Sequence, residues 1–157
     1  MEGADACCFL NYIAGADCDV QIGKIVYTQF LNEDGGIEAD ITVTRLAETS
    51  YIVVTPAATR LADQTWMTRH AFNYNVVIID VTAGEGVLAV MGPNSRKFLN
   101  LISSADLSNE ENPFGTAQEV EIGLGLARIH RVSFVGELGW EIYVSADQAG
   151  HVFEVIA

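Results

Sequence analysis

The chain has 157 residues, of which half are apolar and 18% are charged, so it is long and apolar enough to form a folded domain with a hydrophobic core. Its formal net charge of −13 argues against binding to nucleic acid or to an anionic membrane surface, because both kinds of binding depend on clustered positive charge. No apolar run approaches the ~20 residues that a membrane span needs.

The first five residues are acidic where a secretory signal would be basic. We therefore expect a cytoplasmic protein, or one of the mitochondrial matrix if the source is eukaryotic. Three cysteines without a CxxC motif predict neither a disulfide framework nor a redox pair. The adjacent Cys7 and Cys8 are expected to pack as small apolar side chains in a helix.

Helices and hairpins are expected to alternate along the chain. Periodicity and turn residues predict helices over residues 3–15, 55–70, 95–102 and 149–157, a hairpin over 25–44, and strands over 51–54, 76–79, 85–91, 118–122, 127–135 and 140–144. Thr55 and Pro56 are the expected cap and first residue of the second helix. This order favours an α+β domain with mainly antiparallel sheets over a doubly wound parallel sheet.

The hairpin is the best-defined local prediction. Gly35 and Gly36 can adopt positive φ at little steric cost, so the chain is expected to turn there. In the second arm, apolar and polar residues alternate with a period of two, which puts Asp40 in the middle of a strand on its polar face. A carboxylate at this position either faces solvent or lines a polar cavity, and the hairpin alone favours solvent.

Several other motifs give only weak evidence for a binding or catalytic site. Gly84-Glu85-Gly86 precedes a predicted strand and has the wrong spacing for a dinucleotide-binding loop. The three histidines show no ligand spacing, so no metal site is predicted, and no serine lies in a nucleophile elbow. The basic residues of 128–131 would fall on both faces of a strand, which favours a solvated edge over a binding patch.

The segment 134–141, FVGELGWE, combines two glycines with carboxylates at Glu137 and Glu141. In a strand, Glu141 would lie on the face opposite to Trp140 and Ile142. A carboxylate held in this way suits bidentate acceptance from a flat donor edge, such as a guanidinium or the 2-amino/N3 edge of a pterin. An ordinary surface hairpin explains the same pattern equally well.

Four ordered segments together resemble a known family. They are YTQFLNEDGGIEADITVTR, MGPNSRKFL, DLSNEENPFGTAQEVEIG and RVSFVGELGWEIYV. The chain resembles the folate-binding domain of the glycine cleavage T-protein (aminomethyltransferase) family over residues 3–157. Within that family it is most similar to the C-terminal half of the flavin-dependent sarcosine and dimethylglycine dehydrogenases.

The resemblance implies roles for four residues. Tyr27 matches an aromatic residue near the pterin, and Asp40 matches the aspartate beside the folate nitrogens that receive the one-carbon unit, which makes Asp40 the expected catalytic residue. Glu141 matches the glutamate that grips the pterin edge. Phe134 occupies a folate-binding position at which many members have tyrosine, and Thr55 lies near a position that the T-proteins fill with asparagine. The T-proteins have Asp-Asp where this chain has Ala39-Asp40, which favours the dehydrogenase branch.

The resemblance also implies a function. The expected reaction captures the iminium derived from an N-methyl amine, of the sarcosine or dimethylglycine class, as a methylene unit on tetrahydrofolate. The alternatives are a free-standing aminomethyltransferase that works with a lipoyl carrier protein, and a folate-binding regulator without catalysis.

The family domain continues beyond residue 157, and the dehydrogenases add an FAD domain that this chain lacks. The chain is therefore expected to be a C-terminally truncated part of a longer protein, inactive alone. We also expect it to bind folate weakly and to self-associate through an apolar patch near Tyr27, Phe134 and Trp140.

Overall fold

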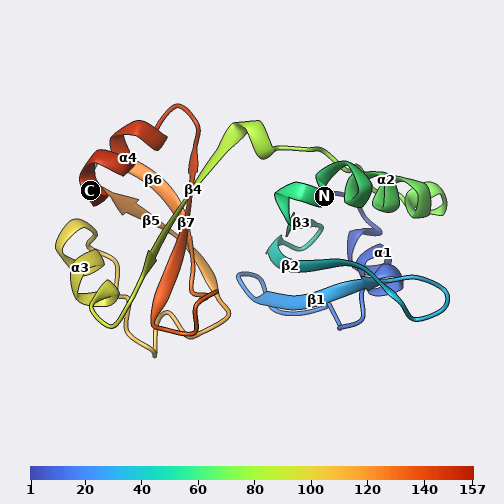
Figure 1. Ribbon diagram of the computed structural model, residues 1–157, viewed down its shortest axis with the longest axis horizontal. Helices are drawn as coiled ribbons and strands as arrows, with labels where there is room; N and C mark the ends of the chain where they lie inside the picture. The colour runs from blue at the N-terminus through green and yellow to red at the C-terminus, as the bar shows by residue number, and fades with distance from the viewer. The chain divides into compact units, whose positions relative to one another are not determined.

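A computed structural model describes residues 1–157, which form two compact units (Figure 1). Unit 1 comprises Met1–Asp80 and unit 2 comprises Val81–Ala157. Each unit has its own β-sheet and its own hydrophobic core. The fold class is α+β with antiparallel sheets, as the sequence predicted.

Unit 1 is built around a three-stranded antiparallel sheet with the strand order β1-β2-β3. Its elements are α1 (Ala6–Ile13), β1 (Ile25–Leu31), β2 (Ile37–Ala47), β3 (Ser50–Val54), η1 (Ala57–Thr59), α2 (Arg60–His70) and η2 (Ala71–Asn73). The predicted hairpin is confirmed as β1 and β2. In its turn, Gly35 has a φ of 77°, and the side chain of Asn32 accepts hydrogen bonds from the backbone N–H groups of Asp34 and Gly36.

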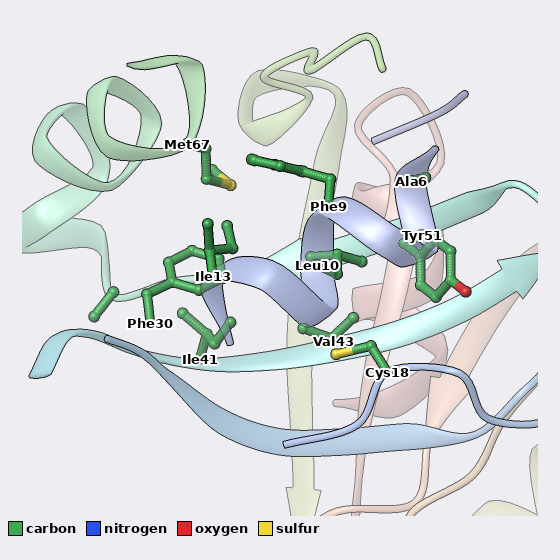
Figure 2. Close-up of a cluster of buried hydrophobic side chains, with 11 residues drawn as sticks. Ala6, Phe9, Leu10, Ile13, Cys18, Phe30, Ile41, Val43, Tyr51 and Met67 are labelled. Atoms are coloured by element: carbon green, nitrogen blue, oxygen red, sulfur yellow. The ribbon is translucent and has the colours of Figure 1, made fainter. Parts of the chain in front are cut away.

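The core of unit 1 lies between α1, the hairpin and α2; in Figure 2, Ile41 and Val43 of β2 lie below α1, whereas Phe9 of α1 points toward Met67 of α2. One face of β2 supplies Ala39, Ile41 and Val43, which are all buried, whereas Ile37 at the start of the same face is exposed. The buried members of this cluster are Ala6, Phe9, Leu10, Ile13, Cys18, Phe30, Ala39, Ile41, Val43, Tyr51 and Met67. Burial of the alternate residues leaves Asp40 on the opposite, polar face of the strand, as predicted.

Two predictions for unit 1 were wrong. The second helix begins at Arg60, because Pro56 has an extended ψ of 137° and is followed by one turn of 3-10 helix. Proline fixes φ but leaves ψ free to be extended, so Pro56 did not have to begin a helix. The apolar run 76–79 is not a strand: Val77 makes a single antiparallel bridge with Glu2 and is 57% exposed.

Unit 2 contains a four-stranded antiparallel sheet with the order β4-β7-β6-β5. Its elements are η3 (Thr82–Gly84), β4 (Glu85–Met91), α3 (Ser95–Ile102), β5 (Ala117–Ile122), β6 (Gly125–His130), β7 (Gly139–Ser145) and α4 (Ala149–Ile156). Helices α3 and α4 lie on one side of this sheet in Figure 1 and pack on its apolar residues. None of the helices combines the length and the apolar character that a membrane span requires.

Trp140 is the centre of a buried polar cluster in unit 2. Its side chain is fully buried, and its indole N–H donates a 2.5 Å hydrogen bond to Oδ1 of Asn112. The guanidinium groups of Arg131 and Arg96 lie 4.8 and 5.7 Å from the centre of the Trp140 ring. Trp140 therefore does not belong to an exposed apolar patch, in contrast to our expectation.

The basic residues of 128–131 were also mispredicted as a solvated edge. His130 is 1% exposed and Arg131 is 9% exposed. Strand β6, which carries Arg128 and His130, lies inside the sheet, between β7 and β5. Sequence alone did not reveal this burial, because the side chains that contact Arg128, His130 and Arg131 come from distant segments.

The two arginines on Trp140 have no carboxylate within 4 Å and share a neutral acceptor instead. Oδ1 of Asn109 accepts from Arg96 at 2.6 Å and from both terminal nitrogens of Arg131 at 3.3 Å. The substitution Asn109→Asp should place a carboxylate against two cations and stabilise the chain by about 1 kcal/mol, since hydrogen bonds to charged groups are stronger. We expect the melting temperature to rise by about 2–4 °C in low salt.

The matched control is Asn100→Asp, which adds the same charge at an exposed position of α3. It should leave the melting temperature almost unchanged. The gain from Asn109→Asp should shrink in about 1 M NaCl, because salt screens the new attraction. A melting temperature that does not rise in low salt would contradict this account of the cluster.

Candidate functional site

The candidate site in unit 1 consists of Tyr27, Gln29 and Asp40 on the polar face of the hairpin. Gln29 lies opposite Asp40 in the antiparallel register, and Tyr27 lies two residues earlier in β1 on the same face. The Tyr27 hydroxyl donates to Oδ2 of Asp40 at 2.7 Å, and the Gln29 amide donates to Oδ1 at 2.9 Å. Both carboxylate oxygens are therefore held by neighbouring side chains.

These hydrogen bonds determine the charge at the site. The hydrogen bond from Tyr27, and then the one from Gln29, lowers the pKa of Asp40 below its ordinary value. The same bond to Asp40 raises the pKa of the Tyr27 phenol. At neutral pH the pair is an ionised carboxylate and a neutral phenol. A carboxylate of this kind stabilises a nearby positive charge well and is a weak proton acceptor.

The exposure of Asp40 and Tyr27 determines which kinds of ligand they can contact. Asp40 is exposed, and Tyr27 has 67% of its surface accessible. The hairpin therefore presents a negative charge beside an open aromatic ring, which fits a flat ligand that carries or develops positive charge. Gln29 was missed in the sequence, because the register shifts by one residue between Phe30 and Leu31, and counting back from the turn would have paired Gln29 with Ala39.

The candidate site in unit 2 is centred on Glu141 in β7. The Tyr143 hydroxyl donates to Oε2 of Glu141 at 2.7 Å, and Oε1 of Glu141 accepts no hydrogen bond. Trp140 and Ile142 are fully buried on the opposite face, as the sequence predicted. Tyr143 was missed, although its position two residues after Glu141 places it on the same face.

The other predicted residues are less constrained. Phe134 is 94% exposed in the segment that precedes β7. Thr55 is partly buried directly after β3, and its side chain makes no hydrogen bond. No three His, Cys, Asp or Glu side chains are grouped so that they could hold a metal ion.

A hollow of about 400 Å³ lies beside α2 in unit 1. It is lined by Glu38, Leu61, Ala62, Asp63, Thr65, Trp66 and Arg69. None of the residues that the sequence singled out lines it. The candidate residues of unit 1 instead lie on the open polar face of the hairpin.

The chain matches one family description along its whole length. The GCVT N-terminal domain family matches residues 1–157. A crystal structure of the glycine cleavage system aminomethyltransferase T from Bartonella henselae superposes with a TM-score of 0.84 and 30% sequence identity. That superposition covers 99% of this chain and 41% of the Bartonella chain.

Two curated relatives are oxidative enzymes by name. The 4-methylaminobutanoate oxidase (formaldehyde-forming) of Paenarthrobacter nicotinovorans is 43% identical over 156 residues, which is 99% of this chain and 19% of that enzyme. The mitochondrial sarcosine dehydrogenase of Mus musculus is 36% identical over 162 aligned positions, which cover 92% of this chain and 17% of that enzyme. The chain thus spans less than half the length of each of these proteins.

Proposed function

This chain belongs to the GCVT N-terminal domain family, and on that premise we propose that it is the tetrahydrofolate-binding, one-carbon-transfer part of a dehydrogenase for N-methyl amines. The substrate class that we propose is sarcosine or dimethylglycine. The observation that carries the proposal is the ionised carboxylate of Asp40, held by Tyr27 and Gln29 beside an exposed aromatic ring. The similarity to two oxidative N-methyl amine enzymes supports the choice of the dehydrogenase branch.

The residues of the hairpin fit tetrahydrofolate by their chemistry. Tetrahydrofolate, when bound, supplies the nitrogen that accepts the one-carbon unit. The open ring of Tyr27 offers a flat surface for an aromatic part of the folate. Asp40 then stabilises the positive charge of the incoming iminium and orients the accepting nitrogen, and its low pKa keeps the carboxylate ionised for that role.

We propose that two residues of unit 2 also contribute to folate binding. Glu141 has one carboxylate oxygen without a hydrogen bond, so it can accept from the donor edge of the pterin. Phe134 is exposed and provides apolar surface but no hydroxyl. FAD would be held by another part of the full-length protein.

Two alternative functions can be distinguished from this proposal by experiment. A free-standing aminomethyltransferase would use the same residues with a lipoyl carrier protein, and the Bartonella structure supports this alternative. Ala39 is buried in the core of unit 1. An aspartate at this position, as in the T-proteins, would therefore be costly here. A non-catalytic folate regulator is favoured by Phe134 and Thr55, because Phe134 lacks the hydroxyl and Thr55 lacks the amide that family members often have at these positions.

The test uses the full-length protein with an N-methyl amine and tetrahydrofolate. We expect methylene-tetrahydrofolate to replace released formaldehyde as the product. The Asp40→Ala variant should lower the ratio of methylene-tetrahydrofolate to formaldehyde by about 100-fold, because an electrostatic group at the reacting centre typically contributes this much. Amine oxidation itself should continue at the wild-type rate.

Asp34→Ala is the matched control, because Asp34 is an exposed carboxylate in the turn of the same hairpin. It should leave the product ratio unchanged. An unchanged ratio in Asp40→Ala would disprove the role of Asp40. Tight folate binding without any transfer in the wild-type protein would instead identify the regulator, and transfer that requires a lipoyl protein would identify the aminomethyltransferase.

A further inference from the structure

Glu141 is supported by a row of side chains on the same face of the sheet in unit 2. We propose that Tyr143 is a positioning residue that fixes the orientation of the Glu141 carboxylate for ligand binding. This inference rests on the proposed function, because it assumes that Glu141 contacts the folate. Tyr143 would then contribute to ligand binding as well as to the packing of β7.

The first support is the direct contact. Residues two apart in a strand point to the same side, so Tyr143 and Glu141 are neighbours on one face of β7. The phenol donates to Oε2 at 2.7 Å, a short distance typical of a hydrogen bond to a charged acceptor. This hydrogen bond leaves Oε1 and one lone pair of Oε2 free to accept hydrogen bonds from the donor edge of a ligand.

The second support is that the tyrosine itself cannot move easily. Tyr143 is 5% exposed, and the ring of His130 lies 4.2 Å from its ring at an angle of 32°. The guanidinium of Arg128 lies 5.6 Å from the ring centre. In the cross-strand register, Arg128 is the β6 residue directly opposite Tyr143.

The third support is the anchoring of that arginine. One terminal nitrogen of Arg128 donates to both oxygens of Glu85 in β4, at 3.0 and 2.9 Å. Its Nε donates to Nε2 of His130 at 3.3 Å. Side chains of two strands, β4 and β6, thus hold the Tyr143 ring in place, and Tyr143 in turn holds the carboxylate.

A long side chain that is already oriented loses less freedom when a ligand binds, so pre-organisation of Glu141 should strengthen binding. Burial, and then the hydrogen bond to Glu141, raises the pKa of the Tyr143 phenol well above its usual range. The phenol therefore remains a proton donor to the carboxylate over the whole physiological range. A tyrosine held this way acts on the ligand only through Glu141.

The test is a double-mutant cycle on tetrahydrofolate binding to the full-length protein, measured by calorimetry. Tyr143→Phe should weaken the Kd by about tenfold when Glu141 is present, because a hydrogen bond to a charged group is lost. In the Glu141→Gln background the same change should alter the Kd by less than about twofold. An equal loss in both backgrounds would show a general structural role and overturn the proposal.

Tyr12→Phe is the matched control, since it removes a phenolic hydroxyl from α1 in unit 1 and should leave the Kd unchanged. A ligand-free measurement separates this inference from the proposed function. In room-temperature crystals of the full-length protein, Glu141 should occupy one rotamer in the wild type and several in Tyr143→Phe. A single rotamer in both would overturn the positioning role. Failure of every variant, and of the wild type, to bind tetrahydrofolate would reject the proposed function, while the rotamer result still decides the inference.

Discussion

Replacing Trp140 by alanine is expected to destabilise unit 2 by about 4 kcal/mol or more. Truncation of a fully buried tryptophan costs about 3–5 kcal/mol through lost burial and the cavity that remains. Two further losses add to this cost. Oδ1 of the buried Asn112 loses its indole donor, and the guanidiniums of Arg96 and Arg131 lose the ring against which they lie.

Such a loss is a large fraction of the total stability of a typical domain, which is about 5–15 kcal/mol. The measurement is urea denaturation followed by circular dichroism. Trp140→Phe is the control, because it keeps an aromatic ring under both arginines and loses only the indole N–H and part of the volume. It should cost clearly less than alanine. A cost below about 1 kcal/mol for Trp140→Ala would refute the central place that we give to this side chain.

Acid should weaken the fold through His130. Burial, and then the adjacent positive charge of Arg128, lowers the pKa of His130 to about 3. An unfolded histidine has a pKa of about 6.5, so between these two values the unfolded chain binds a proton that the folded chain does not bind. The stabilising contribution is therefore complete above pH 6.5 and is lost progressively as the pH falls toward 3.

The expected loss from this residue is about 2 kcal/mol between pH 7.5 and pH 5, because each pH unit in the window costs about 1.4 kcal/mol. Urea denaturation at the two pH values measures it. His130→Phe retains a ring against Tyr143 but cannot bind a proton, so its stability should fall by about 2 kcal/mol less over the same interval. Equal losses in both proteins would show that His130 does not carry this pH dependence.

The sequence predicted the parts of the fold that depend on local patterns. The Gly35 turn and the alternation around Asp40 gave the hairpin, and the apolar periodicity gave α3 and α4. It mispredicted the run 76–79, because four apolar residues alone do not provide a neighbouring strand. The only β-bridge of Val77 is the one to Glu2, which is more than 70 residues away in the chain.

The residues of the candidate sites were likewise predictable only where local patterns determine their positions. Asp40 and Glu141 could be singled out from their strand positions, and their family roles came from resemblance. Their hydrogen-bond partners Gln29 and Tyr143 depend on register and on side-chain orientation. The burial of His130 could not be foreseen either, since it depends on the place of β6 within the sheet.

The cysteines of unit 1 differ in exposure, which allows one of them to be labelled selectively. Cys8 is exposed, Cys7 is partly buried, and burial raises the pKa of the Cys18 thiol to about 11. Thiolates are the form that reacts with maleimides, so a fluorophore should attach to Cys8 well before it reaches Cys18. Cys8 lies in the same unit as Tyr27 and Asp40. The natural sequence therefore already contains an attachment point from which ligand-induced changes in unit 1 can be followed by fluorescence, without an engineered residue.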